Sequence, residues 1–208
     1  MFKGQGLYVC GELALHLHVH KKAIRALGIS ESFVKGVSRR SVLAGVVMRA
    51  DMVIDGFVFS ATTVGGMDAT EKMIEMYENL EREDINLLML NGCIISWYNV
   101  VDLHKIMDEI KRPLLCVTYD ESEGLEKYFV ELFPKDWESR VEVYHWNGSR
   151  TPILLHTGHT VYTRFLNMTL AETKGILNKF TLHGFIPEPL RVARLLARSI
   201  SKAYPSQL

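Results

Sequence analysis

The chain has 208 residues, of which 48% are hydrophobic and 23% are charged, a composition that favours one compact globular domain and excludes a disordered chain. Lysine and arginine total 24, and aspartate and glutamate also total 24, so no global charge attracts a polyanion or an acidic membrane surface. A contact with nucleic acid therefore requires a local patch of basic residues.

The first 22 residues differ in pattern from the rest of the chain. They contain Glu12 and three histidines where a secretory signal peptide needs an unbroken apolar segment, so secretion is not expected. An appended strand, a frayed terminus and an upstream start codon are all compatible with this pattern. We expect an N-terminal extension over residues 1–22 and a single α/β domain over residues 23–208.

Three strands are predicted first. Residues 23–29 form a short apolar run that is typical of a buried strand. Residues 41–49 and 52–64 are rich in β-branched and aromatic residues, and only Ala50 and Asp51 separate them. We expect these last two strands to form an antiparallel hairpin.

The pattern then changes to alternating helices and strands. The predicted elements are a helix from about residue 68, a strand over 85–90, a helix over 100–110, a strand over 113–118, a helix over 125–133, short strands over 152–156 and 161–165, and helices over 169–180 and from residue 187 onward. Three antiparallel-joined strands followed by β-α-β-α-β and flanking helices is the order of ribonuclease H-like mixed sheets, and parts of it occur in other α/β folds.

Cysteine content and hydropathy indicate the compartment. The three cysteines, Cys10, Cys93 and Cys116, are odd in number and lack the spacing of a metal site. No apolar run reaches the roughly 18 residues needed to span a bilayer. We therefore expect a cytoplasmic protein without a membrane contact.

Polar residues gather where the predicted parallel strands end, which is the edge of a sheet that normally binds ligands. Ser30 and Glu31 follow the first strand, Asn91 follows the fourth, Asp68 precedes the first helix and Glu188 begins the last one. A carboxylate cluster at such an edge can hold Mg²⁺ or Mn²⁺ for phosphodiester cleavage. Two of these five positions, however, carry no charge.

Structural roles compete with metal binding at the acidic positions. The sequence Asp-Ala-Thr-Glu at residues 68–71 also has the pattern of a capping box at a helix start. Glu188 is either a metal ligand or a complement to the dipole of the last helix. Asp102 lies one turn into the second helix and faces either the site or water.

A basic stripe is predicted on the last helix. Arg191, Arg194, Arg198 and Lys202 recur at intervals of three and four residues, so they lie along one helix face. Phosphate binding and a solvated outer face both account for such a stripe.

Two further groups suggest other chemistry. His16, His18 and His20 alternate and would share one face of a strand, where they could bind a transition metal. Cys93 with His104 or His156 could form a thiol nucleophile, although Cys93 also suits a small buried position.

Five blocks of sequence are distinctive. They are Ala-Leu-Gly-Ile-Ser-Glu-Ser-Phe at 26–33, Leu-Ala-Gly-Val-Val-Met-Arg at 43–49, Thr-Val-Gly-Gly-Met-Asp-Ala-Thr at 63–70, Met-Leu-Asn-Gly at 89–92 with Tyr-Asn-Val-Val-Asp at 98–102, and Gly-Phe-Ile-Pro-Glu-Pro-Leu-Arg-Val-Ala at 184–193. Together they resemble the archaeal domain-of-unknown-function family numbered ninety-nine, whose members look like relatives of endonuclease V.

The resemblance implies an endonuclease V-like metal site that has lost charge. The family has Gly-Ile-Asp-Asp where this chain has residues 28–31, and Leu-Asp-Gly where it has residues 90–92. In endonuclease V the equivalent aspartates hold the metal that cuts DNA containing deoxyinosine or RNA containing inosine. Ser30 and Asn91 thus replace acids, so we expect weaker metal binding. The implied catalytic positions are Glu31, Asp68, Asn91 and Glu188, and the implied metal ligands are Glu31, Asp68, Glu188 and Asp102.

Three functions follow as hypotheses. The first is a nucleic-acid-binding protein that contacts DNA or RNA through Arg191, Arg194 and Arg198 and has attenuated or absent Mg²⁺-dependent cleavage. The second is a non-enzymatic module that binds a protein or a small molecule on the same fold. The third is an enzyme of different chemistry that uses Cys93.

Overall fold

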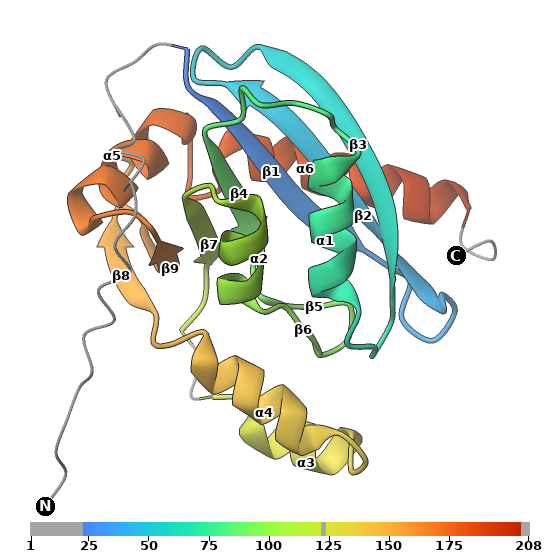
Figure 1. Ribbon diagram of the computed structural model, residues 1–208. Helices are drawn as coiled ribbons and strands as arrows, with labels where there is room; N and C mark the ends of the chain where they lie inside the picture. Colours follow the sequence, from blue (N-terminus) through green and yellow to red (C-terminus); the bar gives the residue numbers. More distant parts are fainter. Residues whose placement is uncertain (1–22, 122–123, 205–208) are drawn as a thin grey trace, which may run out of the picture.

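The computed structural model describes residues 23–121 and 124–204, and a mixed sheet forms its centre. The strands of this sheet are β1 (Arg25–Ser32), β2 (Arg40–Arg49), β3 (Ile54–Thr63), β4 (Leu87–Asn91), β7 (Leu114–Thr118), β8 (Thr151–Leu154) and β9 (Thr160–Leu166). Across the sheet their order is β3-β2-β1-β4-β7-β9-β8 (Figure 1). A separate short ribbon contains β5 (Ile94–Ile95) and β6 (Asn99–Val100).

Helices cover both faces of the sheet. They are α1 (Ala69–Glu78), α2 (Leu103–Ile110), α3 (Glu126–Leu132), α4 (Trp137–Trp146), α5 (Leu170–Phe180) and α6 (Glu188–Ala203). Apolar side chains of α1 and α2 pack on one face, and those of α5 and α6 pack on the other, while α3 and α4 lie together beyond the end of the sheet (Figure 1). Across the part of the chain that the structure describes, no helix is both long and apolar enough to cross a membrane.

The predicted order of elements is confirmed. β1, β2 and β3 pair antiparallel, whereas β4 pairs parallel with β1, and β7 pairs parallel with β4. The register aligns Gly28 of β1 with Met89 of β4, and Leu90 of β4 with Cys116 of β7. The carboxyl ends of these three strands therefore meet at one edge of the sheet.

The sequence did not predict α4, because this helix buries an arginine in place of an apolar stripe. The side chain of Arg140 is 2% exposed. Its guanidinium donates hydrogen bonds to the carbonyl oxygens of Gly65 (2.8 Å), Gly66 (3.1 Å) and Tyr98 (2.6 Å) and pairs with Asp136. These bonds hold α4 against the turn that connects β3 to α1.

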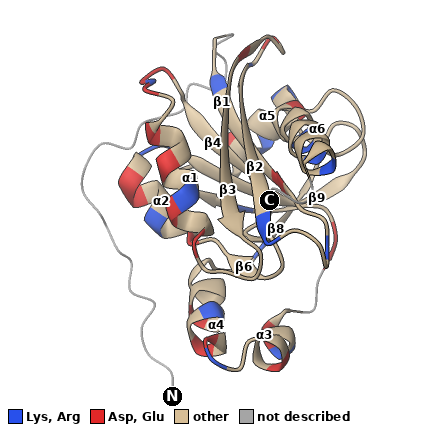
Figure 2. Ribbon diagram, turned by 90° about the vertical axis from the view of Figure 1, so that its right-hand side faces the viewer, with Lys and Arg blue, Asp and Glu red and all other residues tan. Residues whose placement is uncertain are grey.

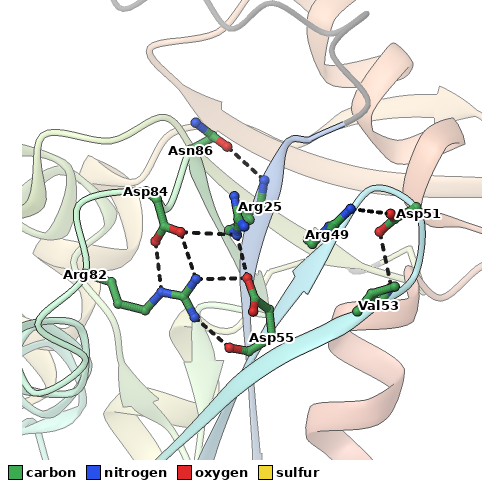
Figure 3. A network of polar contacts seen from close by, with 8 residues as sticks. All are labelled: Arg25, Arg49, Asp51, Val53, Asp55, Arg82, Asp84 and Asn86. Atoms are coloured by element: carbon green, nitrogen blue, oxygen red, sulfur yellow. Dashed lines mark hydrogen bonds and ion pairs between the residues drawn. The ribbon is translucent and has the colours of Figure 1, made fainter.

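An arginine and aspartate network ties together the opposite end of the sheet (Figure 3). Asp55 of β3 accepts from Arg25 of β1 at 2.5 Å and from Arg82 at 2.9 Å, and Arg82 also pairs with Asp84 at 2.8 Å. The hydrogen bonds from Arg25 and Arg82 lower the pKa of Asp55, and that from Arg82 lowers the pKa of Asp84. Both carboxylates are thus already neutralised by arginines within the fold.

Asp68 holds the turn between β3 and α1. It precedes α1, but its side chain does not bond to the helix start, so the predicted capping box is wrong. The carboxylate instead accepts from the hydroxyl of Thr62 (2.5 Å), the amide and hydroxyl of Thr63 (3.1 and 2.9 Å) and the side-chain amide of Asn99 (2.8 Å). Burial raises the pKa of Asp68, but the hydrogen bonds from Thr62, Asn99 and Thr63 outweigh it and lower the pKa to about 2.

We expect Asp68→Asn to lower the free energy of unfolding by about 1–2 kcal/mol at pH 7, after allowance for partial exposure. Because the folded pKa lies below the ordinary value of 3.8, the ionised carboxylate stabilises the fold above about pH 4. That contribution is lost as the pH falls toward 2. Urea denaturation between pH 7 and pH 2 should therefore show a shallower acid loss for Asp68→Asn than for the wild type.

The matched control is Asp108→Asn, which makes the same change at an exposed position of α2. We expect this variant to follow the wild-type dependence on pH. Equal acid dependence of Asp68→Asn and the wild type would show that Asp68 does not stabilise the turn in its charged form.

Candidate functional site

A pocket of about 550 Å³ opens where β1, β4 and β7 end. This is the edge of a parallel sheet at which ligands normally bind, and the volume is in the range of small-molecule sites. α4, β9 and α6 complete the walls. The charged residues that line the pocket are two carboxylates and four arginines, namely Glu31, Asp120, Arg150, Arg164, Arg194 and Arg198.

Two of the arginines come from α6, on which Figure 2 shows basic residues in blue. Ala193 and Ala197 of α6 are buried against β2, and Arg194 and Arg198 follow them by one residue at the rim of the pocket. Within residues 23–121 and 124–204, neither of these arginines forms an ion pair with a carboxylate.

The other members of the predicted basic stripe do not line this pocket. Arg191 donates to Glu188 from Nε (2.8 Å) and Nη2 (2.5 Å), and this bond raises the pKa of Arg191. Lys202 lies one turn beyond Arg198 and is exposed. The structure thus divides the stripe into two pocket residues, one internal ion pair and one surface lysine.

Arg150 lies where the end of β7 approaches β9. Its Nη1 donates to the carbonyl oxygen of Asp120 at 2.9 Å and to the hydroxyl of Thr118 at 3.3 Å. Its guanidinium carbon lies 5.3 Å from the centre of the Tyr162 ring. These contacts hold the positive charge over the end of β7.

Arg164 is buried in β9 at the floor of the pocket. Its Nε donates to the carbonyl oxygen of Gly148 at 2.7 Å, and Nη1 lies 3.4 Å from the sulfur of Cys93. Neither Arg150 nor Arg164 was among the predicted site residues. The available signal was the alternation of Tyr162 and Arg164 along a predicted strand, which places both side chains on one face.

Cys93 lines the pocket and is 1% exposed. A hydrogen bond from Cys116 and the charge of Arg164 lower the pKa of the Cys93 thiol against the effect of burial, while the pKa of Cys116 is raised. The proposed partner histidines lie elsewhere. His104 packs on a tryptophan ring of α4, and His156 bonds to a side chain of α5, so neither lies in position to activate the thiol.

Of the predicted acidic cluster, the structure brings Glu31 and Asn91 together in the pocket. Glu31 accepts a hydrogen bond from the hydroxyl of Ser41 at 2.6 Å. Ser30 points to the other face of β1, where its hydroxyl donates to the carbonyl oxygen of Leu190 at 3.0 Å beneath α6. Position 30 therefore lies outside the pocket, while position 91 lies within it.

The remaining predicted ligands do not line the pocket. Asp68 bonds within the β3–α1 turn, and Asp102 caps α2 by accepting from the amide of Lys105 at 2.9 Å. Glu188 is 7% exposed and bonds to Arg191. Among the described residues, no group of three or more histidine, cysteine, aspartate or glutamate side chains is arranged to hold a metal ion. The histidines at 16, 18 and 20 lie outside the described residues.

Comparison with known proteins identifies relatives of this chain in sequence and in fold. Residues 22–201 match the family described as Endonuclease dU. A UPF0215 protein of Pyrobaculum calidifontis is 34% identical over 174 residues, which are 84% of this chain and 95% of that protein. A protein of unknown function from Archaeoglobus fulgidus, solved by crystallography, has a TM-score of 0.74 at 26% identity and covers 85% of this chain and 98% of its own.

Human ENDOV shares the fold over 93% of this chain and 90% of its own, with a TM-score of 0.59 and 16% identity. The ribonuclease H-like fold and the likeness to endonuclease V that the five sequence blocks implied are thus confirmed. The family number ninety-nine was inexact, because the family that matches this chain is described as Endonuclease dU. By a match that extends over most of its length, this chain belongs to the Endonuclease dU family.

Proposed function

We propose that this protein binds nucleic acid at the arginine-lined pocket and that its metal-dependent phosphodiester cleavage is attenuated or absent. The observation that carries the proposal is the charge of the pocket. Four arginines and two carboxylates line it, so its formal charge is 4 − 2 = +2, although the whole chain is neutral. A local excess of this sign attracts phosphate groups.

Arginine is the side chain best suited to this role. Its planar guanidinium offers paired N–H groups that match the oxygens of a phosphate, and it stays charged at any physiological pH. At an effective dielectric constant near 20, two unit charges 4 Å apart interact by about 4 kcal/mol. Arg194 and Arg198, which make no ion pair with a carboxylate in the described part of the chain, are the residues we assign to phosphate contacts.

The oxygen donors of the pocket do not fit a firmly held Mg²⁺ or Mn²⁺ ion. Such an ion takes carboxylate and other oxygen ligands around an octahedron. One oxygen of Glu31 already accepts from Ser41, and Asn91 offers only a neutral amide oxygen. The surrounding arginines also repel a cation. These features support attenuated cleavage, because the pocket residues do not suit tight binding of a metal ion.

The names of related proteins suggest which nucleic acids to test as substrates. The family is described as Endonuclease dU, and Ciona intestinalis endonuclease V has been solved with DNA that contains an inosine. DNA and RNA that contain deoxyuridine or inosine are therefore the first substrates to examine.

We expect Arg194→Ala with Arg198→Ala to weaken the binding of a single-stranded dodecamer and to reduce its salt dependence. Each phosphate contact removed should lower the slope of log K against log salt by about 0.7. Fluorescence anisotropy between 50 and 300 mM KCl measures both quantities. Lys202→Ala is the control, because it removes a charge from the same helix outside the pocket.

A wild-type affinity that does not fall as salt rises would contradict the proposal and favour the second hypothesis, binding of a protein or a small molecule. Equal salt slopes for the wild type and the double variant would likewise show that these arginines do not contact phosphates.

Cleavage is the second test. With Mn²⁺ and inosine-bearing or deoxyuridine-bearing strands, we expect weak cutting by the wild type and an increase of about tenfold or more in Asn91→Asp, because the new carboxylate attracts the metal. Denaturing gels and calorimetric titration with Mn²⁺ report the two effects. Asn86→Asp makes the same change near the opposite end of β4, where the Asn86 side chain accepts from the amide of Arg25, and should have no effect (Figure 3).

Robust cutting by the wild type that Glu31→Gln abolishes, with the fold intact by circular dichroism, would contradict attenuation. It would show that Glu31 and the neutral Asn91 suffice to hold the metal.

A further inference from the structure

A second hollow, of about 620 Å³, adjoins the pocket. The two share Tyr144, Arg150 and Arg164 as lining residues, so they lie side by side. The second hollow extends to Tyr162 of β9 and His145 of α4. Its position past the end of the first pocket is where a chain-like ligand would continue.

Aromatic rings and guanidinium groups adjoin each other along this path. The guanidinium of Arg150 lies 5.3 Å from the centre of the Tyr162 ring, and that of Arg164 lies 5.6 Å from the Tyr144 ring. Both tyrosines are half-buried. Aromatic rings interleaved with arginines are typical of surfaces that bind single-stranded nucleic acid, because bases stack on the rings while the arginines contact phosphates.

The fold holds these rings in place. Tyr162 and Arg164 are two residues apart in β9 and therefore project from the same face of the strand. β8 pairs with β9 so that Pro152 lies opposite Tyr162. Tyr144 packs edge-on against Phe129 of α3 with ring centres 5.8 Å apart. Rings that are already ordered lose little freedom when a base stacks on them.

The charge of the second hollow differs from that of the first. The second hollow shares Arg150 and Arg164 with the first and adds Glu121 and Glu126, so the formal charge of its own lining, with neutral histidine, is zero. Glu126 also accepts from His145 at 3.0 Å. Affinity in the second hollow should therefore come from stacking and depend little on salt, in contrast to the first pocket.

We propose that the second hollow binds the nucleotides next to those held in the pocket, with a base stacked on Tyr162, so that the partner is a single strand of DNA or RNA. In a duplex the bases stack on each other, so a base must first be unpaired and flipped out, at a cost in free energy, before it can stack on a tyrosine; a single strand avoids this cost. This inference rests on the proposed function and goes beyond it by naming the form of nucleic acid and a residue that selects it.

The test compares Tyr162→Ala with the wild type on two ligands, an oligothymidine dodecamer and an abasic deoxyribose-phosphate strand of the same length. Loss of stacking should weaken dodecamer binding about tenfold in Tyr162→Ala, with the salt slope unchanged. Binding of the abasic strand should be the same for both proteins. Tyr162→Phe keeps the ring and should keep the affinity, and Tyr204→Ala removes an exposed tyrosine elsewhere as a control.

A strand that contains 2-aminopurine gives a reading on the wild type alone, because a base stacked on tyrosine loses fluorescence when it binds. This reading stands even if Tyr162→Ala folds poorly. Unchanged dodecamer affinity in a folded Tyr162→Ala, an equal loss on both ligands, or undiminished fluorescence would each overturn the stacking proposal.

The outcome is separable from that of the proposed function. If strand binding depends on salt and weakens in the double variant Arg194→Ala, Arg198→Ala but not in Tyr162→Ala, the proposal for the pocket stands. The proposal for the second hollow is then overturned. Absence of any strand binding by the wild type overturns both.

Discussion

The close packing of α6 on β1 determines where the positive charge of the pocket lies. A Cβ atom on Gly28 would stand 2.6 Å from the Cβ and carbonyl carbon of Pro189, so the helix can begin there only because this residue has no side chain. From that point α6 runs along β1, and the hydroxyls of Ser32 and Ser201 meet at 2.9 Å near the far end. This packing places Arg194 and Arg198 of α6 at the edge where the parallel strands end. Any side chain at position 28 would move the helix and the charge with it.

The pocket is positively charged although the whole chain is neutral, because several acidic side chains are bound in structural contacts elsewhere in the fold. Asp55 is bound by arginines at the far end of the sheet, Asp68 accepts from two threonines and an asparagine, and Glu188 is paired with Arg191. The carboxylates that the sequence placed at a metal site are therefore largely engaged in structural contacts. What remains at the carboxyl edge is an excess of guanidinium groups, which favours a phosphate over a divalent cation.

Much of the fold follows from periodicity, because the strands of the main sheet and the helices with an apolar face show it in the sequence, whereas the short ribbon of β5 and β6 was not predicted. The meeting of Glu31 and Asn91 was predictable on the same basis, since both end parallel strands. α4 was missed because it buries Arg140. Arg164 reaches the pocket, and Tyr162 reaches the second hollow, through the pairing of β9 with β7, in which bonded residues such as Thr118 and Tyr162 are 44 positions apart. Local patterns contain no information on such a contact. They do place Ser30 and Glu31 on opposite faces of β1, but they do not show that the face with Ser30 lies under α6.

The most direct test of the central claim, that this pocket selects anions over cations, is a crystal structure of the protein with a short deoxyuridine strand and Mn²⁺ present together. The account predicts phosphate density at Arg194 and Arg198 and no anomalous peak between Glu31 and Asn91. A manganese ion held by Glu31 and Asn91, with no phosphate at the two arginines, would contradict it.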